Sequence, residues 1–151
     1  MAKTAMEYAL GYLSRYPKTE QEMKIILMKK GYDGETTQKT MENLKRNDFI
    51  NDEKFAESFF YGEVVKKGKP VYNIKQKLLQ RGIEKSAIES YIAQHEEEIA
   101  QGISEGIERE IATYKKKGVE GFDIIQKLMR KGHRLQDIKS VIQKKQEEGG
   151  E

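Results

Sequence analysis

The amino-acid sequence predicts an all-α protein made of three tandem three-helix repeats, helix-turn-helix-like units stacked into an elongated, curved array. The main observation is a phrase of apolar and basic residues, ending in glycine, that occurs at residues 23–31, 74–82 and 124–132. The three glycines lie 51 and 50 residues apart, a period typical of arrays of small helical units. Helical spacing of apolar residues outweighs strand-like alternation, and only two prolines interrupt the 151 residues.

The composition favours several thin cores over one thick core. Hydrophobic residues make up 36% and charged residues 35% of the chain, against about 45–50% and about 25% in ordinary domains. Cysteine is absent, which excludes disulfides, thiolate metal sites and a cysteine nucleophile. No run approaches about 18 apolar residues and no apolar leader is found, so we expect a cytoplasmic protein with no membrane partner.

The first repeat is expected over residues 1–50. Its first helix ends near Pro17, and Thr19 with Glu22 forms a capping box that opens the second helix. Gly31 can take the left-handed conformation that ends this helix. The apolar positions expected to face inward are Met6, Leu10, Leu13, Met23, Leu27, Met41 and Leu44.

The second and third repeats are expected over residues 51–97 and 98–145, and residues 146–151 form a frayed tail. Residues 51–52 provide the N-cap of the second repeat, and its first helix breaks at Gly68. The inward positions expected in the second repeat are Phe55, Phe59, Val64, Ile74, Leu78, Ile88, Tyr91 and Ile92. The third repeat has the most regular stripe, formed by Ile99, Ile103, Ile107, Ile111 and Tyr114.

Equivalent positions of the three copies agree. The residue four before the glycine is Leu27, Leu78 or Leu128, and the residue six after it is Thr37, Ile88 or Ile138. Ten after it stands Met41, Ile92 or Ile142, and eighteen before it stands Leu13, Val64 or Tyr114. We interpret these registers as one small core per repeat, with no catalytic role.

Charge is distributed unevenly along the chain. Residues 66–85 and 126–145 each carry a net charge of +6, whereas residues 95–110 carry −5. An alternation of basic and acidic segments suits a protein partner with patchy charge better than a uniform polyanion. Solvated helix faces are the alternative explanation.

Three segments resemble the signature of the RecX family: residues 49–56, residues 67–70 and residues 74–83. Within them Asp52, Phe55, Ala56 and Gly82 count as structural signature residues. The resemblance covers the whole chain, because the family is also built of three tandem three-helix repeats. The sequence departs from the family at Tyr61, where an arginine is common, and over residues 69–73, which lack the arginines often found before Ile74.

The resemblance implies a monomeric binding protein that regulates the bacterial recombinase RecA. RecX-like proteins lie in the groove of the RecA filament on single-stranded DNA, where they slow filament growth, strand exchange and ATP hydrolysis. Tyr61 and Tyr72 are candidates for fixing the register of binding. Basic residues are expected to contact RecA and the DNA that it holds: Lys66, Lys67, Lys69, Lys75, Lys77, Arg81, Lys115, Lys116, Lys117, Lys127, Arg130, Lys131 and Arg134.

The alternative is a stand-alone DNA-binding module, since three-helix units with a glycine in the turn resemble helix-turn-helix elements. Weak direct DNA binding is also compatible with RecA binding. Against the alternative, residues 85–89 of a third helix offer little to base edges. No enzyme is expected: the sequence has no phosphate loop of the Walker kind and no nucleophile elbow. His95 and His133 have no second histidine at ligand spacing, so no metal or cofactor is expected, and His133 is expected to be a partly buried spacer.

Overall fold

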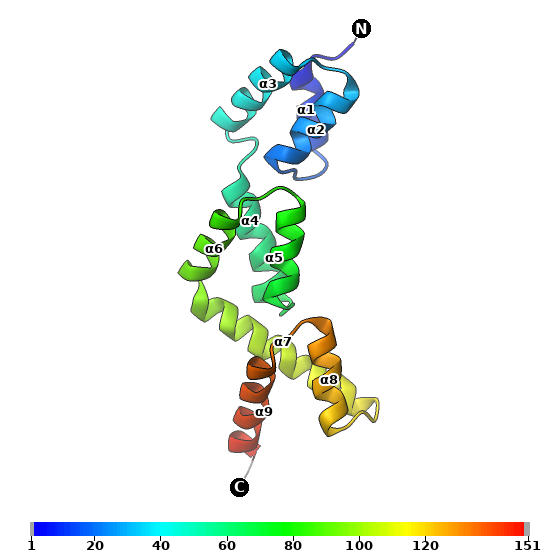
Figure 1. Ribbon diagram of the computed structural model, residues 1–151, viewed down its shortest axis with the longest axis vertical. Coiled ribbons are helices and arrows are strands. Elements are labelled where there is room, and N and C mark those ends of the chain that lie inside the picture. Colours follow the sequence, from blue (N-terminus) through cyan, green and yellow to red (C-terminus); the bar gives the residue numbers. More distant parts are fainter. Residues whose placement is uncertain (1, 150–151) are drawn as a thin grey trace. The chain divides into compact units, whose positions relative to one another are not determined.

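The computed structural model describes residues 2–149, and their regular elements are all helices, as predicted (Figure 1). None of these helices is both long and apolar enough to cross a membrane. In chain order they are α1 (Ala5–Leu13), α2 (Glu20–Lys30), α3 (Gly34–Arg46), α4 (Asp52–Phe60), the π-helix η1 (Tyr61–Lys66), α5 (Val71–Gln80), α6 (Lys85–Gln94), α7 (Glu96–Lys116), α8 (Gly121–Lys131) and α9 (Leu135–Gly149).

The chain forms two compact units. Unit 1 contains Met1–Ser58 and Lys77–Glu89, and unit 2 contains Phe59–Gln76 and Ser90–Glu151. Helices α4, α5 and α6 each begin in one unit and end in the other. The three predicted repeats do not coincide with these units, and their boundaries stay a prediction.

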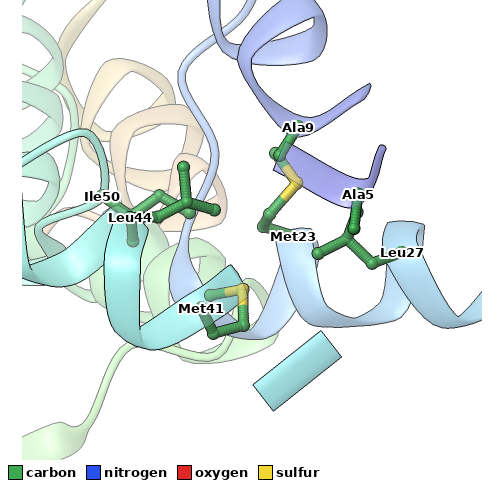
Figure 2. Packing of buried hydrophobic residues seen from close by; sticks show 7 residues of the cluster. All are labelled: Ala5, Ala9, Met23, Leu27, Met41, Leu44 and Ile50. Carbon is green, nitrogen blue, oxygen red and sulfur yellow. The ribbon is translucent and has the colours of Figure 1, made fainter. Parts of the chain in front are cut away.

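The core of unit 1 lies where α1, α2 and α3 meet. Figure 2 shows its buried side chains: Ala5, Ala9, Met23, Leu27, Met41, Leu44 and Ile50. The expected positions on α2 and α3 are confirmed. On α1 the predicted Met6, Leu10 and Leu13 are partly buried and pack against the core, but the buried centre of the helix is formed by Ala5 and Ala9, which were not predicted. Alanine lets α1 approach its neighbours closely, and the larger side chains pack along the edges of the contact.

Both ends of α2 follow the prediction. The Thr19 hydroxyl accepts a hydrogen bond from the Glu22 amide at 3.2 Å, and the Glu22 carboxylate accepts one from the Thr19 amide at 3.0 Å. Gly31 ends the helix in the left-handed conformation, with φ of 111°. Thr4 and Glu7 form a second capping box at the start of α1. Helix ends in this protein are therefore set largely by local sequence.

The start of α4 divides two capping roles between adjacent residues. The Asn51 side chain accepts from the Lys54 amide at 3.0 Å and so caps α4 itself. The Asp52 carboxylate instead accepts from the Glu20 amide at 2.9 Å, at the first residue of α2. Burial raises the pKa of Asp52, although the Glu20 amide favours its ionised form. Asp52 therefore joins two segments of unit 1.

The buried face of α4 and η1 differs from the prediction. Phe60 is fully buried, together with Ala56 and Val64, whereas Phe55 and Phe59 are half-buried. Residues 56, 60 and 64 are four apart and share one helical face, so Phe60 takes the core position that was expected for Phe59. The π-helix that follows α4 was not predicted.

Glycines bring η1 and α7 together in unit 2. Cβ atoms built on Gly102 and Gly106 would lie 2.6 Å from the Val65 carbonyl oxygen and 2.7 Å from the Gly68 Cα. Gly68 has φ of 70° and breaks the chain as expected, and it too has no room for a side chain. The predicted isoleucine stripe of α7 is buried at all four isoleucines. Two glycines one turn apart on α7 thus allow direct backbone contact.

The second and third copies of the repeated phrase each accept a hydrogen bond from a residue that lies just before the preceding copy. In unit 1 the Thr19 hydroxyl donates to the Arg81 carbonyl at 2.6 Å, and in unit 2 the Asn73 side-chain amide donates to the Lys131 carbonyl at 2.6 Å. Arg81 and Lys131 each directly precede the glycine of their copy. Cβ atoms built on those glycines would collide with the side chains of Gln21 and Asn73, which lie just before the first and the second copy.

The equivalent positions are buried most completely near the glycines. Leu27, Leu78 and Leu128 are fully buried, and Thr37, Ile88 and Ile138 are nearly so. Burial is less complete at the positions eighteen before and ten after each glycine, where Leu13, Tyr114, Ile92 and Ile142 are half-buried. Helix α9 continues to Gly149, so residues 146–149 are helical and are not a frayed tail. Gln146 to Glu148 are compatible with a helix, and within it the Gln143 side chain donates a hydrogen bond to Glu147 at 3.3 Å. Residues 150–151 lie outside the described part.

Candidate partner-binding surface

Arg81 is held inside unit 1. Its guanidinium donates to both carboxylate oxygens of Glu22, each at 3.0 Å, and lies 4.5 Å from the centroid of the Phe55 ring. Burial raises the pKa of Glu22, but the hydrogen bonds from Arg81 and the Thr19 backbone outweigh it, so this pKa lies below its ordinary value. This geometry gives Arg81 a structural role, in addition to the partner contact that was expected of it.

The lysines near η1 differ in how they are paired. Lys67 and Lys69 both contact Glu63, at 3.4 Å and 2.5 Å. These contacts lower the pKa of Glu63, and the hydrogen bond from Lys69 has the larger effect. Lys66 is exposed, with its Nζ 5.9 Å from the centroid of the Tyr61 ring. A partner that binds Lys67 or Lys69 must therefore share the lysine with Glu63.

The basic residues of α7, α8 and the start of α9 divide in the same way. Lys131 pairs with Glu110, and Arg134 makes two hydrogen bonds of 3.0 Å to Asp137. Lys115, Lys116 and Lys117 end α7 as exposed side chains, and no ion pair to them is found within residues 2–149. Arg130 is exposed and Lys127 is half-buried on α8. In unit 1, Lys77 is also exposed.

Four cations line one pocket of unit 2. The pocket has a volume of about 590 Å³, and Lys67, Lys69, Arg109 and Lys131 contribute to its wall together with Glu110. Sequence reasoning named three of these cations and missed Arg109, which lies within the acidic segment of residues 95–110. Its signal in the sequence was weak: it is the one basic residue of that segment.

A second pocket of unit 2 is mainly apolar. Its volume is about 520 Å³, and Ile92, Ile99 and Ile103 form part of its wall, with Tyr72 and Lys75 also lining it. Tyr72 is 65% exposed and Tyr61 is 45% exposed. Both tyrosines proposed to fix register are thus accessible to a partner.

The two histidines have structural surroundings. His133 is buried, more completely than expected, and its Nε2 lies 3.3 Å from Glu110 Oε2. Burial lowers its pKa below the ordinary value, although Glu110 favours the protonated form. The His95 ring stacks on Tyr91, and its Nδ1 lies 2.9 Å from the Tyr91 carbonyl oxygen. Among residues 2–149 no three His, Cys, Asp or Glu side chains are grouped to hold a metal.

Comparison with known proteins gives a consistent result. Residues 5–44 match the family model described as RecX, first three-helix domain. The chain is 35% identical over 86 residues to the regulatory protein RecX of Streptococcus gordonii, covering 57% of this chain and 33% of that protein. It is 34% identical over 101 residues to the regulatory protein RecX of Caldanaerobacter subterraneus subsp. tengcongensis, covering 65% of this chain and 51% of that protein. The matches thus span a third to a half of these relatives.

Solved structures agree on the fold. The crystal structure of RecX from Lactobacillus salivarius superimposes with a TM-score of 0.79 at 22% identity, covering 93% of both chains. A second crystal structure of regulatory protein RecX gives a TM-score of 0.75 at 20% identity, covering 92% of this chain and 70% of the other. At such identity the comparison supports a shared arrangement of helices.

Proposed function

This chain belongs to the RecX family of regulatory proteins, and from that membership we propose that it binds the recombinase RecA and the filament that RecA forms on single-stranded DNA. Bound there, it inhibits ATP hydrolysis, filament growth and strand exchange, acting in the cytoplasm as a monomer and without catalysis of its own. The observation that supports the proposal most directly is the similarity to proteins named regulatory protein RecX.

The distribution of paired and unpaired cations suggests which residues make the first contacts. An exposed lysine without a carboxylate partner attracts an acidic surface without first breaking an ion pair, and such charges mainly speed encounter. We assign this role to the exposed cations Lys66, Lys77, Lys115, Lys116, Lys117 and Arg130. Arg81 is excluded from this set because its charge is already matched by Glu22.

The test is the single-stranded-DNA-dependent ATPase of a cognate RecA, titrated with this protein below stoichiometry. The variant Lys115→Glu/Lys116→Glu/Lys117→Glu should raise the concentration for half-inhibition at least tenfold. The matched control is Lys29→Glu/Lys30→Glu, which reverses exposed lysines at the end of α2 outside the proposed surface. Equal inhibition by the variant and the wild type would reject the assigned residues.

A direct interaction with DNA is the competing function. Wild-type protein that binds bare duplex with a steep salt dependence, and leaves the RecA ATPase unchanged at equimolar concentration, would favour a stand-alone DNA-binding module. Full inhibition at well under one molecule per RecA, with no comparable affinity for duplex, would support action on the filament.

A further inference from the structure

We infer that the pocket of unit 2 lined by Lys67, Lys69, Arg109 and Lys131 binds a phosphate group. The pocket draws these cations from three places in the sequence: the segment after η1, the middle of α7 and the end of α8. All of them belong to the same compact unit, so the unit itself fixes their arrangement.

Arg109 is tied to the backbone beside this pocket. One of its terminal nitrogens donates to the Lys67 carbonyl oxygen at 3.1 Å, which holds the guanidinium at the edge of the pocket. Among residues 2–149 no carboxylate forms an ion pair with Arg109, so its positive charge is not matched. Guanidinium has five N–H donors in a planar fork that suits phosphate oxygens, and the bond to Lys67 uses only one of them.

The lysines are positioned by carboxylates that do not cancel the charge of the pocket. Glu63 contacts Lys67 and Lys69, and Glu110 contacts Lys131. Four cations and two carboxylates leave two positive charges around the same space. A phosphate monoester carries about −1.5 to −2 at neutral pH, which matches this excess.

The backbone around the pocket leaves no room for side chains. Gly68 and Gly106 both line it, and a Cβ atom on either would overlap the backbone of the other. His133 also lines the pocket, and its Nε2 lies 3.3 Å from Glu110 Oε2. The pocket is therefore a fixed feature of unit 2, formed where the backbones of Gly68 and Gly106 meet.

The experiment uses the full ¹⁵N-labelled chain and inorganic phosphate at pH 7.5, with sodium chloride adjusted to hold ionic strength constant. The backbone amide signals of Gly68, Gly106 and Thr113, which line the pocket, should shift and saturate. Arg109→Gln should weaken the apparent affinity at least fivefold. Arg46→Gln is the control, because Arg46 is an exposed arginine that does not line the pocket and is not among the proposed partner contacts.

A second variant distinguishes a ligand site from a structural role. Glu110→Gln removes the carboxylate that competes for Lys131 and should strengthen phosphate binding, whereas a variant that merely damaged the fold would weaken it. Shifts that do not saturate, or that are equal in the wild type and Arg109→Gln, would overturn the inference.

The source of the phosphate group is resolved by two further probes. A nucleoside monophosphate that competes with inorganic phosphate for the same amides would indicate a free phosphate ligand. A short oligothymidylate without terminal phosphate that shifts these amides more strongly would indicate the phosphodiester backbone of single-stranded DNA. Since no RecA is present, this test can fail while the proposed inhibition of RecA stands, and the reverse is equally possible.

Discussion

Arg81 shows how one basic residue differs from the exposed lysines around it. Its two hydrogen bonds to Glu22 and its position over Phe55 require the planar guanidinium. We expect Arg81→Lys to lower the free energy of unfolding by about 1–2 kcal/mol, because the lysine keeps the charge but loses the two-point bond and the stacking. Urea denaturation measures this change.

The control for Arg81 is Arg46→Lys, since Arg46 is exposed and, among residues 2–149, its side chain bonds only Asn43. That variant should change stability by less than about 0.5 kcal/mol. A stable Arg81→Lys protein that had lost RecA inhibition would instead make Arg81 a partner contact.

His133 makes the stability of the protein depend on pH near neutrality. Burial lowers the pKa of this histidine in the folded state, so the unfolded chain binds its proton more readily. Stability attributable to His133 is complete above about pH 6.5, the ordinary pKa, and is lost as pH falls below that value toward the folded pKa. Glu110, Asp137 and Lys131 are the charged groups that act on it.

Unfolding in urea between pH 7.5 and pH 5.5 tests this expectation. The wild type should lose stability over this range, and His133→Gln should lose less, because glutamine does not titrate. Glu22 does not affect this comparison, because its pKa is lowered and its contribution to stability is lost only at more acidic pH. Parallel pH curves for the two proteins would contradict the assignment.

At the scale of elements, the approach of α7 to η1 depends on glycine. A Cβ atom on Gly106 would lie 2.7 Å from the Cα and the carbonyl oxygen of Gly68, where backbone on both sides must move. We expect Gly106→Ala to destabilise the protein by about 1–3 kcal/mol through overpacking. Gly11→Ala in α1 is the matched control, because among residues 2–149 a Cβ atom built there meets no atom within 4 Å apart from its own helix backbone and chain neighbours, and it should stabilise by about 0.5–1 kcal/mol. Thermal unfolding of both variants checks the opposite signs.

Elements defined by neighbouring residues could be predicted from the sequence. The capping box of α2, the cap glycine Gly31 and the isoleucine stripe of α7 depend on residues within a few turns of one another. Asp52 capping another helix and Gly106 meeting Gly68 could not be predicted, because these pairs are 32 and 38 residues apart and their contact depends on tertiary packing.

At the scale of the whole molecule, the distribution of charge predicts salt-sensitive association. The chain carries a net charge of only +3, yet its basic residues are concentrated in separate segments. If it binds RecA filaments as proposed, the association rate should fall about tenfold between 50 and 300 mM salt, because exposed charges are screened, while the dissociation rate changes little. Surface-immobilised filaments and flowing protein allow both rates to be measured. A salt effect confined to dissociation would place the charges inside the bound interface.

The candidate surface could be predicted only in part. Net charge per segment is readable from the sequence, and it indicated the lysines of η1, α7 and α8. Which of these lysines are already paired with a carboxylate depends on tertiary contacts, such as Glu63 with Lys69 and Glu110 with Lys131. Arg109 could not be found in this way, because the net charge of its segment is dominated by six glutamates, although one of them, Glu110, lines the same pocket.

The carbonyl that precedes each of the two later cap glycines has a consequence for how such a chain can change over time. A main-chain acceptor is independent of side-chain identity. Thr19 and Asn73 can therefore both donate a hydrogen bond to a backbone carbonyl oxygen, although different side chains surround the two contacts. The residues beside the two hydrogen bonds differ: Glu22 pairs with Arg81 at the first, and Asn73 lies against Gly132 at the second. The backbone carbonyl can therefore accept a hydrogen bond in either place, whereas the surrounding side chains distinguish one contact from the other.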